Sequence, residues 1–231
     1  MNEKKAAAFF DKDNAATYDK QRASLTPIKD ALFLLTRMVL SDLPAQANIL
    51  CVGVGTGAEL KALAQVNPEW RFTLVEPAAA MMDICREEAE KLDLSDRCIF
   101  HEGYLHTLPG ADPFDAATAM LVSHFLLDLS ERRGFFTEIA SRLRPDGWLV
   151  NADLSGDQES TRFAGLFDMW GKTMKHSGMP TAHVEKICSF KGVSLLPATE
   201  IEALLIESGF RDPTLFYQAG LMHGWCSKRS G

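Results

Sequence analysis

The sequence is poor in three features that would place a protein outside the cell or in a membrane. Its five cysteines are an odd number with no Cys-x-x-Cys pair, which is typical of reduced thiols rather than of a disulfide scaffold. No apolar run reaches the ~18 residues that a membrane-spanning helix needs. The opening stretch MNEKKAAAFFDKDN has no signal-peptide core. We therefore expect a cytoplasmic protein with no membrane partner.

Positive charge is also scarce. The chain has 24 Lys and Arg against 31 Asp and Glu, a net charge of −7 and a pI of about 5.4. Such a surface has little general attraction for the phosphates of nucleic acid, so a nucleic-acid partner is not expected. The small cluster Glu-Arg-Arg at 131–133 is predicted to be solvated. The six histidines are dispersed and show no i, i+4 pair of a helical zinc site, so we expect no metal.

Strand-like and helix-like segments alternate along most of the chain. Short apolar runs suited to buried parallel strands are separated by stretches of helical periodicity. This rhythm predicts an α/β fold with a seven-stranded, mostly parallel, doubly wound sheet and helices on both faces. The last two strands are joined tightly around Gly220, and we expect them to form an antiparallel hairpin at one sheet edge. The strands are expected at residues 48–54, 71–76, 97–103, 114–121, 148–154, 213–220 and 221–228.

The expected organisation is a single domain, residues 1–231, with an embellishment on either side of its core. A helical lid precedes the sheet, and a helical insertion, one helix and then a shorter one, interrupts the rhythm before the sixth strand. Apolar residues recur on one face of the longer helix, which indicates packing against the core. The divisions are 1–44 for the lid and first helix, 45–154 for the ligand-binding core, 155–196 for the cap insertion, and 197–231 for the C-terminal helix and hairpin.

Prolines bound two of the predicted helices. One runs from Thr26 to Pro44, and its apolar positions, which include Leu32 and Leu35, predict that it packs on the sheet. The other covers residues 129–147 and is expected to stop at a Pro-Asp-Gly turn.

A glycine-rich bend, NILCVGVGTGAE, follows the first predicted strand. Gly53 permits a tight turn, Gly55 lets the backbone approach a ligand, and Gly57 opens a helix whose N–H groups face the site. Glu76 ends the next strand, where a carboxylate can accept hydrogen bonds from both hydroxyls of a ribose. The pairing predicts a site for an adenosine-containing cofactor at the carboxyl ends of the strands.

Two other interpretations of the bend stay open. The glycines could serve close packing alone. The spacing Gly53-x-Gly55-x-x-Ala58 also satisfies the dinucleotide fingerprint, which would predict a nicotinamide-dependent oxidoreductase.

Motifs in order along residues 45–228 resemble those of the class I S-adenosylmethionine-dependent methyltransferases. ILCVGVGTG matches that family's cofactor loop and LVEP its ribose-binding strand end, while LRPDGWLVNADL resembles the turn before its fifth strand. The resemblance implies a Rossmann-like fold, S-adenosyl-L-methionine as cofactor, and methyl transfer to an oxygen, nitrogen or carbon nucleophile by in-line displacement. The lid and the insertion would enclose a small-molecule acceptor and obstruct a polymer.

The resemblance also assigns residues to the site. The stretch AATYDKQRASLTP resembles a lid in which a tyrosine and a basic residue close over the methionine end of the cofactor. His124, just past the fourth strand, is the candidate catalytic residue, as a base or a substrate-orienting group; the alternative is a hydrogen-bonded histidine that packs the loop. The cofactor-binding residues implied are Tyr18, Arg22, Gly53, Gly55, Thr56, Gly57, Glu76, Pro77, Met81, Gly103, Tyr104 and Leu121.

Among the departures from the family's pattern, two bear on catalysis and cofactor binding. Cys51 stands where the family usually has Asp, and Tyr104 where an Asp usually accepts a hydrogen bond from the adenine amino group. Tyr104 is expected either to stack on the adenine or to leave that bond to Glu102 or a backbone group. The departures keep open a non-catalytic cofactor-binding module, and a localised basic face would favour an RNA-modifying methyltransferase. A homodimer is also compatible with the sequence.

Overall fold

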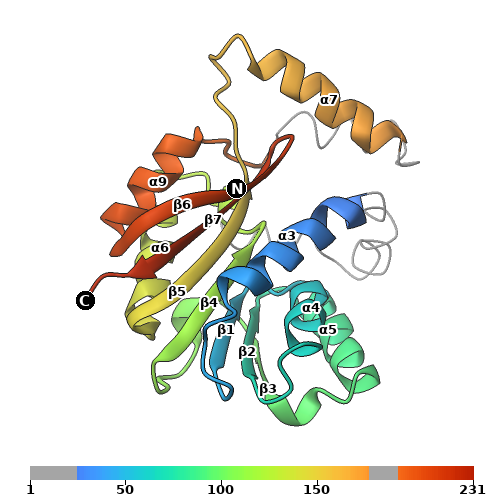
Figure 1. The fold of residues 1–231 in the computed structure, drawn as a ribbon, viewed down its shortest axis with the longest axis vertical. Coiled ribbons are helices and arrows are strands. Elements are labelled where there is room, and N and C mark those ends of the chain that lie inside the picture. Colours follow the sequence, from blue (N-terminus) through green and yellow to red (C-terminus); the bar gives the residue numbers. More distant parts are fainter. Residues whose placement is uncertain (1–24, 177–191) are drawn as a thin grey trace.

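The computed structural model describes residues 25–176 and 192–231, in which seven strands form one sheet of order β3-β2-β1-β4-β5-β7-β6 (Figure 1). Neighbouring strands from β3 to β5 are parallel, whereas β7 is antiparallel to both of its neighbours. The predicted seven-stranded sheet with a C-terminal antiparallel hairpin is confirmed. The strands are β1 (Asn48–Val52), β2 (Arg71–Glu76), β3 (Cys98–Glu102), β4 (Phe114–Met120), β5 (Leu143–Leu154), β6 (Phe210–Ala219) and β7 (Met222–Arg229).

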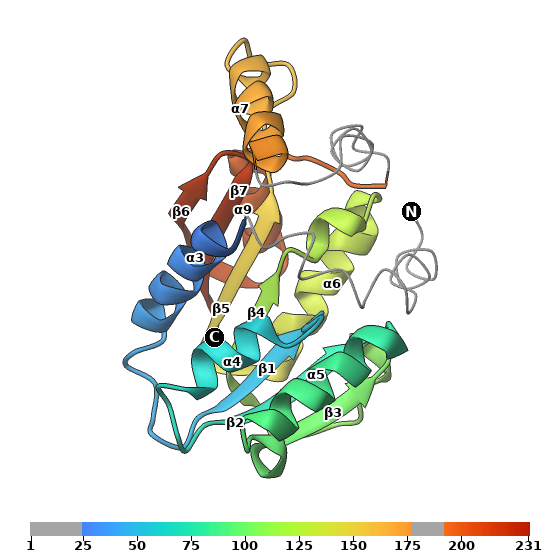
Figure 2. The same cartoon turned by 90° about the vertical axis from the view of Figure 1, so that its right-hand side faces the viewer.

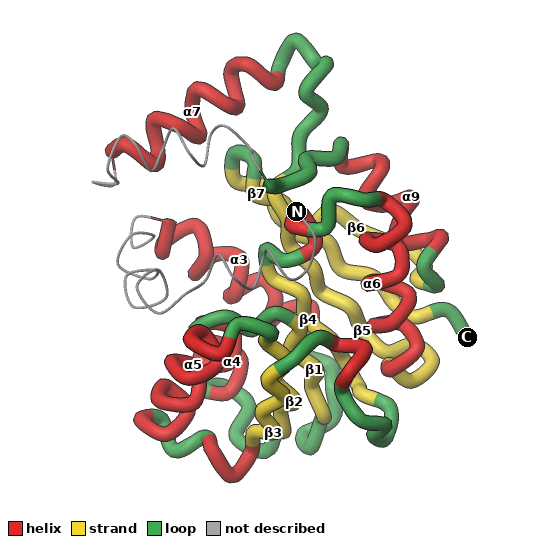
Figure 3. Tube along the Cα trace, turned by 180° about the vertical axis from the view of Figure 1, so that it is seen from behind, coloured by secondary structure: helices red, strands yellow, loops and turns green. Residues whose placement is uncertain are grey.

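Helices cover both faces of the sheet (Figures 2 and 3). Successive residues of a strand point to opposite faces. Accordingly, Ile49 of β1 packs with Leu60 of α4 on one face, and Leu50 packs with Phe136 of α6 on the other. The helices are α3 (Thr26–Val39), α4 (Ala58–Ala64), α5 (Ala79–Lys91), α6 (Leu129–Arg142), α7 (Phe163–His176) and α9 (Ala198–Glu207), with the short 3₁₀ turns η2 (Ser95–Arg97), η3 (Leu105–Thr107) and η4 (Ser123–Phe125).

Helix α3 is shorter than predicted. It begins at Thr26 with Pro27 in its first turn, as expected, but ends at Val39 rather than at Pro44. Leu32 is buried, whereas Leu35 is 37% exposed, so the packed face of the helix differs from the predicted one.

Helix α6 also ends earlier than predicted, at Arg142. Residues 143–147 form the first part of β5, where the pairing with β4 shifts register. Asp146 adopts a left-handed conformation, φ 62°, within this irregularity. The Pro-Asp-Gly segment is therefore a distortion inside a strand and not a helix terminus.

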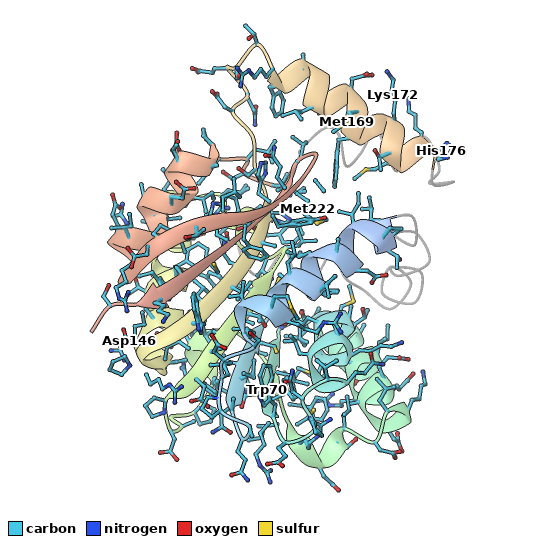
Figure 4. The ribbon with its side chains drawn as sticks, in the orientation of Figure 1. Trp70, Asp146, Met169, Lys172, His176 and Met222 are labelled. Atoms are coloured by element: carbon cyan, nitrogen blue, oxygen red, sulfur yellow. The ribbon has the colours of Figure 1, made fainter. Side chains whose placement is uncertain are left out.

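Helix α7, within the predicted insertion, lies next to the turn that joins β6 and β7 (Figure 1). Trp170 and Met174 are buried in a cluster that includes Met222, which Figure 4 shows near α7 at the start of β7. The predicted apolar face of this helix is thus a packing face. The second, shorter helix expected in the insertion and the lid expected before residue 25 lie outside the described residues.

Candidate active site

A cavity of about 440 Å³ lies where the parallel strands end. Its lining comes from the bend after β1, the end of β2 with the start of α5, the segment after β3, the loop after β4 and one face of α6. Cavities of roughly 300–1,000 Å³ are typical of small-molecule sites. The carboxyl ends of the strands are also where doubly wound sheets bind ligands.

The glycine bend shapes one wall of the cavity. Gly53 has φ 71°, and a Cβ at this position would lie 2.5 Å from a methyl carbon of Val122 in the loop after β4. Gly55 has φ 57°, and no atom of the described residues lies within 4 Å of the position that its Cβ would take. The first glycine therefore allows two loops to touch, and the second leaves open space beside the backbone.

Glu76, the last residue of β2, also lines this side of the cavity, and two backbone N–H groups orient its carboxyl group. Oε2 accepts a hydrogen bond from the Gly55 N–H at 3.0 Å, and Oε1 accepts one from the Ala78 N–H at 2.9 Å. Burial raises the pKa of Glu76, and the two N–H groups partly offset that rise. Each oxygen keeps a second lone pair, so the carboxylate can also accept from two neighbouring hydroxyls.

The structure brings most of the predicted cofactor residues to one cavity. Gly53, Gly55, Glu76, Pro77, Met81, Gly103, Tyr104 and Leu121 line it. Thr56 and Gly57 lie at the start of α4 and are not among the lining residues. Tyr18 and Arg22 lie outside the described residues.

His124 lies behind the cavity, in a buried polar cluster. Its Nδ1 is 2.9 Å from Oδ1 of Asp153, which also accepts the His124 backbone N–H at 2.9 Å. Oδ2 of Asp153 accepts from the Ser123 hydroxyl at 2.5 Å and from Arg132 at 3.2 Å. Burial alone would raise the pKa of Asp153, but Arg132, His124 and Ser123 hold it below its ordinary value. His124 does not line the cavity.

This cluster fixes the loop after β4. Leu121, which lines the cavity, has φ 61°, a conformation that is costly for a side chain with a Cβ. Its N–H donates to Ala152 at 2.7 Å, and the next residues, Ser123 and His124, bond to Asp153. The loop therefore holds its strained shape through bonds to β5.

Sequence patterns missed two features of helix α6. Arg132 was predicted to be solvated but is fully buried, because it pairs with Asp153 from a strand distant in sequence. One face of α6, containing Glu131, Gly134, Phe135 and Glu138, lines the cavity. The i, i+3, i+4, i+7 spacing marks these four as one face, but no local signal says that it faces a cavity.

Residues 25–176 and 192–231 contain neither a metal-binding cluster nor a membrane-spanning helix. No group of three or more His, Cys, Asp or Glu is placed to hold a metal ion there, and no helix there is long and apolar enough to cross a membrane.

A family model described as a methyltransferase domain matches residues 49–147. This stretch contains the bend, Glu76 and the loop after β4, on a sheet with the strand order given above. Residues 49–147 are thus similar in sequence to methyltransferase domains. The predicted relationship to the S-adenosylmethionine-dependent methyltransferases is thereby confirmed.

Two curated proteins show sequence similarity to this chain. The biotin biosynthesis bifunctional protein BioHC of Teredinibacter turnerae is 25% identical over 179 residues, which are 74% of this chain and 29% of the relative. The ubiquinone biosynthesis O-methyltransferase of Methylocella silvestris is 32% identical over 118 residues, 51% of this chain and 43% of the relative. The chain thus spans less than half the length of either.

Solved structures share the fold of this chain. A possible exported protein of Bordetella parapertussis has a TM-score of 0.70 at 18% identity, over 89% of this chain and 68% of that one. An O-methyltransferase family protein of Burkholderia thailandensis has a TM-score of 0.61 at 16% identity, over 87% and 57%. At sequence identities this low, the similarity shows the fold alone.

Proposed function

We propose that this chain transfers a methyl group from S-adenosyl-L-methionine to an oxygen, nitrogen or carbon atom of a small-molecule acceptor. The observation that carries the proposal is the pairing of Gly55 with Glu76. The Gly55 N–H orients the carboxylate, and the missing side chain leaves room for a ligand beside it. A ribose held by Glu76 fits this pairing. The methyltransferase family match supports the same cofactor.

The chain would hold the cofactor with residues of one wall. Glu76 would accept from the ribose hydroxyls, and Pro77 and Met81 offer apolar surface to the base. When bound, the cofactor supplies an electrophilic methyl group on a sulfonium. The protein's part is to align the acceptor with that group and to exclude water. Tyr18 and Arg22 stay predictions for the methionine end.

A role for His124 in the reaction also stays a prediction. An ionised Asp153 only accepts hydrogen bonds, so the contact assigns the hydrogen to Nδ1 and leaves Nε2 as the basic nitrogen. The imidazole of His124 contacts the ring of Phe125, with 4.4 Å between the ring centroids, and Phe125 lines the cavity. An acceptor that must lose a proton would depend on such a base, whereas one without a proton to lose would not.

The sheet order favours methyl transfer over the oxidoreductase alternative. The standard dinucleotide-binding sheet has mostly parallel strands in the order 3-2-1-4-5-6. Here the antiparallel β7 lies between β5 and β6.

The test is ligand-induced stabilisation with S-adenosylmethionine, S-adenosylhomocysteine and NAD, each added separately. A ligand at a hundredfold its dissociation constant adds about 2.7 kcal/mol, which raises Tm by several degrees. We expect both sulfur-containing ligands to raise Tm and NAD not to. Glu76→Ala should remove the shift. The matched control is Glu102→Ala, because Glu102 pairs in register with Glu76 but is exposed and does not line the cavity.

The outcomes separate the alternatives. A shift with NAD alone, or an undiminished shift in Glu76→Ala, would overturn the proposal. The Tm of each variant without ligand identifies a folding defect. Binding without any release of S-adenosylhomocysteine, across a panel of phenols, amines and carboxylic acids, would favour a non-catalytic module.

A further inference from the structure

The cavity has a second wall whose role the proposed function leaves open. Glu131, Gly134, Phe135 and Glu138 of α6 form this helix wall, and Tyr104 and His106 lie beside it in the segment after β3. The rings of Tyr104 and His106 are stacked, with centroids 5.8 Å apart and 6° between their planes. Glu76 lines the same cavity, so a planar base whose ribose is bound at Glu76 would lie in the space that this wall encloses.

Glu138 is the carboxylate of the helix wall that the fold holds in place. Arg142, one turn later, donates to its Oε1 through Nε at 2.9 Å and Nη2 at 2.8 Å. The same guanidinium donates to the carbonyls of Leu105 at 3.1 Å and Leu108 at 3.0 Å. Arg142 thus fixes Glu138 relative to the segment that contains Tyr104 and His106.

The second oxygen of Glu138 is available. No described residue bonds to Oε2, and the side chain is 35% exposed at the cavity. Glu131 also lines the cavity, but it is exposed and no described cation holds it.

The acceptor suggested earlier, Glu102, is not suited to the task. Its carboxylate lies 3.4 Å from Arg86 on the exposed side of α5, and it does not line the cavity. Glu76 uses an oxygen for each of two backbone N–H groups and faces the ribose position. The hydrogen bond from the adenine amino group, which Tyr104 cannot accept as an aspartate would, therefore needs another acceptor, and α6 offers one.

Resting on the proposed function, we propose that Oε2 of Glu138 accepts a hydrogen bond from the exocyclic amine of the adenine. The base would be recognised by Glu138 of α6, whose carboxylate Arg142 holds in place, instead of by a carboxylate that follows β3. Glu138 then makes the cavity selective for a 6-aminopurine. A hydrogen bond to a charged acceptor gives about 10- to 100-fold in affinity.

The experiment measures dissociation constants for two ligands by calorimetry. One is S-adenosylhomocysteine, and the other is its analogue with hydrogen in place of the 6-amino group. The unmodified protein should prefer the first by about 10- to 100-fold. Glu138→Gln should reduce that preference to about one, because Arg142 draws the amide oxygen to itself and turns the NH₂ toward the adenine amine.

A matched control is Glu207→Gln. Glu207, the last residue of α9, forms an ion pair with Arg133 of α6, and neither residue lines the cavity, so the substitution removes an equal charge from an ion pair with the same helix but outside the site. It should leave the preference unchanged. Glu138→Asp, which keeps the charge but shortens the reach, should lose most of the preference. Tm without ligand shows whether each variant is folded.

The results distinguish this inference from the proposed function. If the unmodified protein binds neither S-adenosylhomocysteine nor S-adenosylmethionine, the proposed function fails. If it binds S-adenosylhomocysteine but ignores the 6-amino group, or keeps its preference in Glu138→Gln, only the role of Glu138 is overturned. If Glu131→Gln loses the preference for the 6-amino group and Glu138→Gln keeps it, the role of Glu138 is also overturned.

Discussion

Two buried carboxyl groups lie beneath the two loops that meet at the cavity, on opposite faces of the sheet. Glu59 of α4 lies under the glycine bend, and Asp153 of β5 under the loop after β4. Glu59 accepts from the Thr118 hydroxyl at 2.9 Å and from the Cys51 thiol. Asp153 has a guanidinium, an imidazole and a hydroxyl as partners.

The partners decide the charge of each group. Burial raises the pKa of Glu59 to about 7, because two weak neutral donors compensate little of the lost hydration. Burial acts on Asp153 in the same direction, yet its pKa falls below the ordinary value because Arg132 lies beside it. Although both groups are buried, Glu59 titrates near pH 7 on one face of the sheet, whereas Asp153 stays ionised on the other.

The largest expected effect contrasts the two carboxyl groups directly. Asp153→Asn should lower the free energy of unfolding by about 3–5 kcal/mol, because it leaves Arg132 charged and unpaired in the interior. Glu59→Gln at pH 4, where the acid is largely neutral in the folded and the unfolded chain, should cost less than about 1 kcal/mol, because a neutral amide replaces a neutral acid. Urea denaturation measures both. Equal losses in the two variants would contradict the assigned charges.

The second prediction uses pH. The pKa of Glu59 is higher in the folded chain than its ordinary value of 4.5, so the stability it contributes is complete below pH 4.5 and lost as pH rises through about 7. The loss is about 3 kcal/mol at ~1.4 kcal/mol per pH unit. Asp153, with a lowered pKa, acts in the opposite sense: its contribution is present above its ordinary value of 3.8 and lost at lower pH.

The measurement is the free energy of unfolding between pH 4.5 and pH 8. Glu59→Gln should remove most of the decline seen in the unmodified chain, whereas Asp153→Asn should leave it in place. A decline of the same size in Glu59→Gln would show that another group causes it.

The smallest expected effect removes one hydroxyl from each cluster. Ser123→Ala deletes a donor to a charged acceptor and should cost about 1.5–3 kcal/mol, whereas Thr118→Val, beside a neutral acid, should cost about 1 kcal/mol. Thr118→Val should also move the pKa of Glu59 further up, since the lost hydroxyl lowers it now. Thermal unfolding compares the pair, and the reverse ranking would undo the comparison.

Much of the first cavity wall could be predicted from sequence because its determinants are local. A turn with positive φ at Gly53 and Gly55 needs glycine, and Glu76 ends the strand that follows. Within a parallel sheet these positions meet at one edge whatever the loops do. The mostly parallel sheet followed from the alternation of strands and helices.

The helix wall and the polar cluster could not be predicted, because their determinants are long-range. Arg132 belongs to a cluster of charges that looks solvated until Asp153 is placed beside it, 21 residues further along the chain. Glu138 looks like one more exposed acid on an amphipathic helix until Arg142 and the carbonyls after β3 come together. Periodicity identifies a face, but only the tertiary arrangement identifies what lies against it.

The reversal of β7 has a consequence for the order in which the chain can fold. Among the described strands β6 pairs only with β7, so it has no sheet partner until the strand that follows it in sequence has formed. The strands that border the cavity, β1 to β4, do not depend on that step. A chain shortened before Met222 would therefore keep the strands around the glycine bend but leave β6 as an unpaired edge exposed to other molecules.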